Sequence, residues 1–133
     1  MSNLDVVKSA YAAFARGDAD ALLAKFDEQI EWRPAQGHPY APDGGPWVGH
    51  DEVVANLLMR VAADWDGFSA TPAAFHDAGE TVAVEGRYGG SYRASGASLD
   101  APFCHVWTVR DGKVAVFRQY VDTAHLSQVM RST

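Results

Sequence analysis

Side chains suited to proton transfer or ligand contact gather in two parts of this sequence. The first is the segment of residues 34–49, in which His38, Tyr40 and Trp47 lie among four prolines and four glycines. A loop of this length inside a compact domain is usually functional or disordered, and three ring-bearing residues argue against disorder. Histidine commonly transfers protons near neutral pH. We therefore treat His38 as a candidate catalytic residue, and Tyr40 and Trp47 as candidate ligand contacts.

The second part is a predicted hairpin, residues 103–122, with Asp111-Gly112 at its turn. Asp-Gly between two runs rich in β-branched and aromatic residues is typical of a two-residue type I′ turn. Regular pairing outward from this turn predicts that His105 lies opposite Arg118. It also predicts that Cys104 lies opposite Gln119.

Alternation along the two strands gives this hairpin two faces. One face carries the more conspicuous side chains, which include His105, Trp107, Arg118 and Tyr120. The other face is quieter and includes Cys104, Val106, Phe117 and Gln119. The chemistry available to the protein depends on which of these two faces lines a pocket.

The remaining elements that position these side chains follow from hydrophobic periodicity. We expect helices over residues 3–16, 18–26, 50–64 and 124–130, with Asn3 and Asp18 as N-caps of the first two, and strands over residues 29–33, 68–75, 81–92, 103–110 and 113–122. Helices followed by gathered strands indicate an α+β fold with an antiparallel sheet. Such a sheet can curl around the helices and leave a cavity. Trp32 and Tyr88 fall on inward strand positions, so Trp32 is a candidate ligand contact and Tyr88 a second catalytic candidate.

Bulk composition excludes several classes of function. The chain has 133 residues, one cysteine and a formal net charge of −6, so we expect one domain over residues 1–133 and no nucleic-acid partner. The five histidines lack metal-ligand spacing, and no phosphate-binding glycine motif is present. We expect no metal and no cofactor. The sequence has no stretch apolar enough to span a membrane and no leader-like start, which predicts a cytoplasmic protein.

Five segments together resemble a known family, namely residues 10–18, 21–26, 30–32, 47–53 and 111–122. They are similar to the SnoaL-like and ketosteroid-isomerase-related branch of the nuclear-transport-factor-two-like superfamily. This resemblance implies a cone-shaped curved antiparallel sheet wrapped around three N-terminal helices, with a deep pocket and often a homodimer. The superfamily includes isomerases, cyclases, dehydratases, epoxide hydrolases and non-catalytic binders, so its fold alone does not fix an activity.

The resemblance also bears on the two faces of the hairpin. Cys104 stands where ketosteroid isomerase has an acidic hydrogen-bond donor, and Gln119 stands where SnoaL and limonene epoxide hydrolase have a pocket carboxylate. The isomerase's tyrosine falls at about Ala10. Together with the expected register, these matches imply that the quieter face lines the pocket, which makes its four residues ligand contacts (Cys104, Val106, Phe117 and Gln119). The other face is then the expected homodimer interface, through His105, Trp107, Arg118 and Tyr120.

Two functions follow as hypotheses. The first is an isomerase or cyclase, or a lyase, that acts without a cofactor on a small, apolar or aromatic ketone-type molecule by acid–base catalysis, with His38 and Tyr88 as catalytic residues. The second is a non-catalytic binder of a small hydrophobic ligand in the same pocket. A cysteine and a glutamine at the two inherited positions supply no general base, which favours the second hypothesis.

Overall fold

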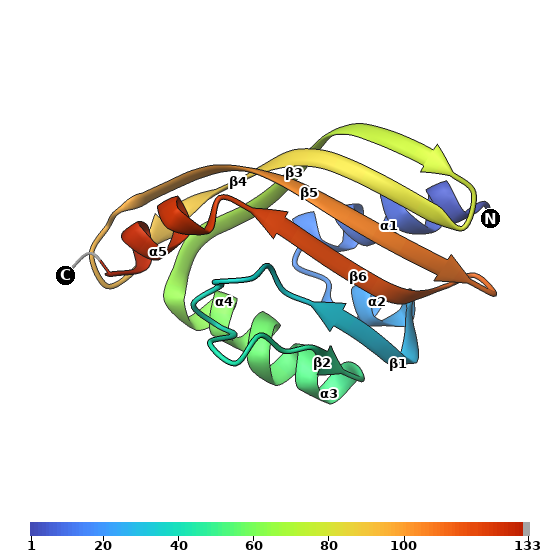
Figure 1. Ribbon diagram of the computed structural model, residues 1–133, viewed down its shortest axis with the longest axis horizontal. Helices are drawn as coiled ribbons and strands as arrows, with labels where there is room; N and C mark the ends of the chain where they lie inside the picture. The colour runs from blue at the N-terminus through green and yellow to red at the C-terminus, as the bar shows by residue number, and fades with distance from the viewer. Residues whose placement is uncertain (132–133) are drawn as a thin grey trace.

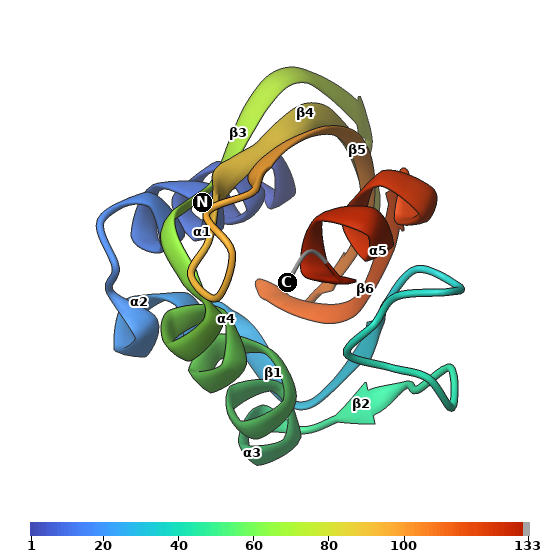
Figure 2. The ribbon, with the colours of Figure 1, turned by 90° about the vertical axis from the view of Figure 1, so that its left-hand side faces the viewer.

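The computed structural model describes residues 1–131. Its main feature is a six-stranded, strongly curved sheet with helices along its concave side (Figures 1 and 2). The strands are β1 (Phe26–Arg33), β2 (Trp47–Val48), β3 (Trp65–Ala78), β4 (Thr81–Tyr92), β5 (Ser98–Arg110) and β6 (Lys113–Val121). The helices confirm an α+β fold, since most of them precede the long strands.

The sheet has the strand order β2-β1-β6-β5-β4-β3. Neighbouring strands are antiparallel except for β1 and β6, which run parallel. The predicted curved sheet is confirmed, and it is antiparallel at every pair of neighbouring strands except this one. Most of the chain separates β1 from β6, so nothing restricts their connection to a short hairpin.

Helices α1 (Asn3–Ala15) and α2 (Ala19–Ala24) match the first two predicted helices. Asp18 caps α2 as expected, because its side chain accepts a hydrogen bond from the Ala21 amide. The cap of α1 is Ser2 and not Asn3, since Ser2 and Asp5 form a reciprocal capping box. The buried face of α1 includes Tyr11, which packs towards the sheet.

The predicted helix over residues 50–64 is present as three consecutive segments. They are α3 (His50–Val53), a π-helical turn η1 (Val54–Leu58) and α4 (Met59–Asp64). The last helix, α5 (Thr123–Arg131), lies at one end of the curved sheet and contacts β5 (Figure 2). Among residues 1–131, no helix has the length and apolar composition that a membrane crossing requires.

Bulges and one glycine allow the sheet to curve. The register of β3 against β4 shifts twice, between Asp66 and Ser69 and between Pro72 and Ala74, and such bulges bend a sheet. Pro72 is tolerated because β3 is an edge strand. A Cβ atom on Gly86 would lie 2.4 Å from the Phe103 ring, so only glycine lets that ring pack across β4.

The turn of the β5–β6 hairpin is as predicted. Asp111 and Gly112 have φ angles of 52° and 76°, which a type I′ turn requires. Arg110 pairs with Lys113 across the turn. The register therefore starts from the expected pair.

A β-bulge then changes the register of this hairpin. Val109 pairs with Val114. Its neighbour Thr108 pairs with Val116, which leaves Ala115 as an extra residue on β6. Side chains alternate between the two faces of a sheet along each strand. One extra residue on β6 therefore shifts the pairing with β5 by one position beyond the bulge, so that residues expected on one face lie opposite residues of the other face.

The predicted cross-strand pairs were consequently wrong by one residue. His105 lies opposite Gln119 and not Arg118. Cys104 lies opposite Tyr120 and not Gln119. Beyond the bulge, the residues of β6 that we expected to face inward do so. On β5 the residues that we expected to face outward face inward.

Burial follows the corrected register. His105 and Trp107, which we expected on an outer interface, are each 3% exposed and lie inside the curved sheet. Cys104 and Val106, which we expected in the pocket, are half-buried and lie outside its lining. Tyr120 is 56% exposed, so it remains on the outer face.

Candidate functional site

The concave side of the sheet encloses an apolar cavity of about 70 Å³. One water needs on the order of 10–15 Å³ by a comparable measure, so the cavity has room for a molecule larger than water. Its walls come from α1, α2, the loop after β1, the η1–α4 helix, α5 and strands β1 and β3–β6, and most of them are aromatic or aliphatic. The lining residues are Ala10, Tyr11, Phe14, Leu22, Trp32, His38, Tyr40, Leu57, Val61, Trp65, Phe68, Ala70, Tyr88, Leu99, His105, Trp107, Phe117, Gln119, Leu126 and Met130.

The polar centre of the cavity is His105, which bonds to two tyrosines. Its Nδ1 atom lies 2.6 Å from the hydroxyl oxygen of Tyr11 on α1. Its Nε2 atom lies 2.5 Å from the hydroxyl oxygen of Tyr88 on β4. The Phe103 ring stacks on the imidazole with 3.9 Å between centroids. Three elements distant in sequence therefore converge on one imidazole.

Two further side chains hold the two tyrosines of this hydrogen-bonded series in place. The indole nitrogen of Trp107 donates to the Tyr11 hydroxyl over 3.0 Å. The Gln119 amide nitrogen donates to the Tyr88 hydroxyl over 2.9 Å. The orientation of that amide is settled by its other end, because Oε1 of Gln119 accepts the backbone N–H of Ala35 over 3.0 Å.

Burial keeps His105 neutral. Removal from water lowers the pKa of His105 to about 3, because an apolar environment disfavours the imidazolium. Burial likewise raises the pKa of both Tyr11 and Tyr88 far above neutral pH. At pH 7 the cluster therefore consists of two neutral phenols and one neutral imidazole.

The loop after β1 supplies a second polar group, His38. Its Nδ1 atom accepts the backbone N–H of Tyr40 over 3.0 Å, so a neutral His38 carries its proton on Nε2. Burial, and to a lesser extent the charge of Arg60, lowers the pKa of His38 to about 4. His38 thus lines the cavity as a neutral N–H donor at pH 7.

Tyr40 ties this loop to the end of the helical wall. Its hydroxyl donates to Asp64 over 2.6 Å and accepts the indole N–H of Trp65 over 3.3 Å. The Arg60 guanidinium lies 4.0 Å above the Tyr40 ring and donates to the Tyr40 carbonyl. Burial and the hydrogen bond to Asp64 raise the pKa of Tyr40, so its hydroxyl remains protonated.

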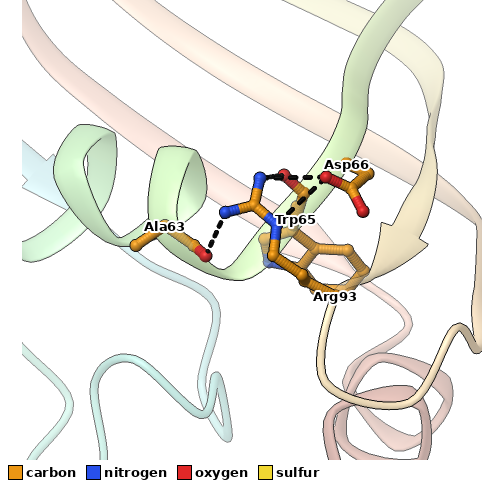
Figure 3. A network of polar contacts seen from close by, with 4 residues as sticks. All are labelled: Ala63, Trp65, Asp66 and Arg93. Carbon is orange, nitrogen blue, oxygen red and sulfur yellow. Dashed lines mark hydrogen bonds and ion pairs between the residues drawn. The ribbon is translucent and has the colours of Figure 1, made fainter.

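A polar network outside the cavity holds Trp65 in place (Figure 3). Arg93 donates to the backbone oxygens of Ala63 and Trp65 over 2.8 Å and 3.0 Å. It also pairs with Asp66 at 2.9 Å. This guanidinium therefore connects the turn after β4 to the junction between α4 and β3, where Trp65 enters the wall of the cavity.

Six of the nine predicted site residues line this cavity, namely Trp32, His38, Tyr40, Tyr88, Phe117 and Gln119. Trp47 is buried but outside the lining, and it pairs with Trp32 across β2 and β1. Cys104 and Val106 lie on the outer side of β5, for the reason given above. Within the described residues, no three His, Cys, Asp or Glu side chains are grouped to hold a metal ion.

Two residues at the centre of the site, Tyr11 and His105, were not predicted from the sequence as site residues. Tyr11 lies on the apolar stripe of α1, a pattern that indicates burial and not a role in the site. It stands one residue after Ala10, where the resemblance places a catalytic tyrosine. His105 was assigned to the outer face because of the register error. The only sequence signal for His105 was its type, a histidine within an otherwise apolar strand.

Comparison with known proteins establishes the family. The model of the SnoaL-like domain matches residues 7–117, so the chain belongs to the SnoaL-like domain family. Among curated proteins, none matches the chain.

Solved structures agree with this assignment. A nuclear-transport-factor-two-like protein from Burkholderia thailandensis is 37% identical, with a TM-score of 0.92 over 98% of both chains. TerC, crystallised with polyporic acid, is 27% identical, with a TM-score of 0.85 over 98% of both chains. A SnoaL-like polyketide cyclase, so described provisionally, from Jannaschia is 15% identical, with a TM-score of 0.82 over 98% of this chain and 92% of that one. This last likeness concerns the fold alone.

Proposed function

We propose that this protein binds a small, largely apolar ring compound with a carbonyl oxygen and promotes its isomerisation or cyclisation by proton transfer. The observation that carries the proposal is the composition of the cavity wall. Aromatic and aliphatic groups form most of it, and neutral hydroxyl, imidazole and amide groups provide its polar contacts. Such a wall favours a neutral ligand with few polar atoms.

The polar groups are suited to a carbonyl ligand. A carbonyl oxygen only accepts hydrogen bonds, and the site offers the neutral N–H of His38 and the hydroxyl of Tyr88 as donors. In an enclosed apolar site such donors stabilise developing negative charge on oxygen more strongly than they do in water. Tyr88 and His38 are thus our candidate catalytic residues, and Gln119 orients Tyr88.

The relatives support a small-molecule ligand without identifying it. TerC was crystallised with polyporic acid, and the match between the two proteins covers 98% of each chain.

A non-catalytic binder is the second candidate. One specific observation favours it, since no carboxylate belongs to the described lining of the cavity. A carboxylate would be the usual general base for carbon acids, and Gln119 cannot take up a proton near neutral pH. A ligand that copurifies and is released unchanged would support this candidate, whereas turnover that pocket substitutions abolish would exclude it.

Binding is tested with a matched pair of substitutions on β3. Ala70 lines the cavity, whereas Ala73 is exposed on the same strand. We expect Ala70→Phe to fill the cavity and weaken the binding of 2-naphthol at least tenfold, measured by quenching of tryptophan fluorescence. Ala73→Phe should bind like the wild type. Equal affinity in both variants would contradict the location of the site.

Catalysis is tested with a panel of aromatic ketones followed by NMR. We expect conversion by the wild type, with a loss of at least tenfold in both His38→Ala and Tyr88→Phe. Full activity in both variants would exclude the assigned roles.

A further inference from the structure

The Tyr11–His105–Tyr88 cluster has more protons that can be donated than it has internal hydrogen bonds. Two bonds join the imidazole to the two hydroxyls. A neutral imidazole brings one proton and each phenol brings one, so three protons are available for two bonds. One hydroxyl proton is always left over.

The position of this extra proton depends on the imidazole tautomer. When Nδ1 carries the proton and donates to Tyr11, Tyr88 donates to Nε2, and the O–H of Tyr11 is free. When Nε2 carries the proton, the free O–H belongs to Tyr88. Trp107 and Gln119 each donate a hydrogen bond to one of the two phenol oxygens and so occupy one lone pair on each.

Both tyrosines line the cavity, so either free hydroxyl can meet a ligand there. The two states of the cluster differ only in which end donates to the ligand and which end can accept from it. Interconversion requires the two bonded protons to move along their hydrogen bonds while the ligand takes the free proton of one tyrosine and gives a proton to the other, with no movement of heavy atoms of the protein.

We propose that His105 is a tautomeric relay that carries a proton between Tyr11 and Tyr88, so that the cavity withdraws a proton from one position of a bound carbonyl compound while it protonates another. This inference rests on the proposed function, and it deepens that function by naming the substrate class, an enolisable ring ketone. In this mechanism Tyr11 and Tyr88 are the catalytic residues, and His105 acts through them.

One step of the relay balances as follows. A C–H bond next to the carbonyl breaks and its proton passes to the Tyr11 oxygen, while the electron pair forms a C=C bond and the carbonyl π pair moves to oxygen. The Tyr11 proton passes to Nδ1 of His105, the Nε2 proton passes to Tyr88, and the Tyr88 proton passes to the ligand oxygen. The product is the enol, and each protein group holds as many protons as before.

A second step in the opposite direction restores the cluster. Tyr11 returns a proton to the original carbon, or to the far carbon when the enol is conjugated with a second C=C bond, while Tyr88 takes the enol proton and the imidazole reverts to its first tautomer. The net reaction is exchange of the proton next to the carbonyl, or a 1,3 proton shift in an unsaturated ketone. Concerted transfer avoids a tyrosinate or an imidazolium, both of which burial makes unfavourable.

The experiment uses 2-tetralone as a probe and measures deuterium incorporation next to its carbonyl in D2O by proton NMR. We expect the wild type to accelerate exchange at least 100-fold over buffer. Tyr11→Phe, Tyr88→Phe and His105→Gln should each lose at least 100-fold of that acceleration. Tyr11→Phe combined with Tyr88→Phe should be no slower than either alone, because the relay acts as a unit.

A matched control and a binding measurement separate the relay from a structural role. His76→Gln changes an exposed histidine that pairs with Glu85 on the outer surface, and it should retain the wild-type rate. His105→Gln should still bind 2-naphthol within threefold of the wild type while exchange is lost. Equal losses of binding and exchange would assign His105 a structural role and overturn the relay.

A third measurement needs no variant. In protein labelled with 15N-histidine, His105 at pH 7 should show a neutral ring with its proton shared between both nitrogens. An imidazolium at pH 7, or binding of 2-tetralone without any accelerated exchange, would overturn the relay and leave the proposed binding function intact. Failure of both 2-tetralone and 2-naphthol to bind would contradict the proposed function, and with it the relay.

Discussion

The buried histidines predict a specific dependence of stability on pH. His105 has a pKa of about 3 in the folded protein, against an ordinary value of 6.5 in the unfolded chain. Between these values the unfolded chain binds a proton that the folded protein does not bind. The free energy of unfolding is therefore highest above about pH 6.5, and it decreases as the pH falls through this interval.

The size of the effect follows from the two pKa values. Between pH 7 and pH 5, protonation of one such histidine in the unfolded chain lowers the free energy of unfolding by about 2 kcal/mol. His38, with a pKa of about 4 in the folded protein, contributes a similar amount over the same interval. Both side chains are less than a tenth exposed, so solvent screens these effects little.

The assay is urea denaturation at pH 7 and pH 5, followed by circular dichroism. Replacement of His105 by glutamine removes its proton uptake, so the decrease from pH 7 to pH 5 should be about 2 kcal/mol smaller in His105→Gln than in the wild type. His38→Gln should reduce the decrease by a similar amount. The comparison concerns the change with pH, and it is independent of any loss of stability at pH 7.

His76→Gln provides the control, because His76 is exposed and its pair with Glu85 lies on the surface. Exposed ion pairs contribute little to stability, so this variant should show the wild-type decrease within a few tenths of a kcal/mol. The reasoning is refuted if His105→Gln and His38→Gln lose stability on acidification as steeply as the wild type does.

Three further predictions concern the walls of the cavity and the outer face. Gly86→Ala should lower the free energy of unfolding in urea by about 2 kcal/mol or more, because the added Cβ would lie 2.3 Å from a backbone oxygen of β3 and 2.4 Å from the Phe103 ring. Tyr40→Phe leaves Asp64 without its hydroxyl donor, so it should cost about 1–3 kcal/mol and speed hydrogen exchange in residues 34–49. We also propose a homodimer through the outer sheet face, where Tyr120→Asp should halve the mass measured by light scattering.

Each of these has a contrary result. Unchanged stability in Gly86→Ala would mean that β3 can move away from β4 at little cost. Slow exchange in the Tyr40→Phe loop would show that other contacts hold residues 34–49. A wild-type monomer at micromolar concentration would exclude the dimer.

Elements with local signals were predictable from the sequence. The N-cap at Asp18, the turn at Asp111-Gly112 and the alternation of β4 depend on residues near them in the chain, and the structure confirms all three. The pairing of β1 with β6 depends on contacts between distant segments, so periodicity could not show that these strands are parallel.

The site was predictable where burial followed from one strand alone. Trp32 and Tyr88 were placed inward by the alternation of their own strands, and both line the cavity. The expected face of each β5 residue depended on regular pairing with β6. The bulge at Ala115 breaks this regularity, so His105 faces the cavity and not the outer surface. No glycine or proline marks this bulge, and its position depends on packing across the whole sheet.

The bulge also makes the length of β6 a determinant of the cavity's charge. Insertion of one residue between the turn and Gln119, with the bulge kept, would shift the rest of β6 by one position, withdraw Gln119 from Tyr88 and direct Arg118 towards His105. The neutral interior therefore depends on a count of residues as well as on their identities. Descendants of this chain could exchange many side chains on β6 and keep the same chemistry, whereas a single codon gained in this segment would place a permanent positive charge inside the cavity.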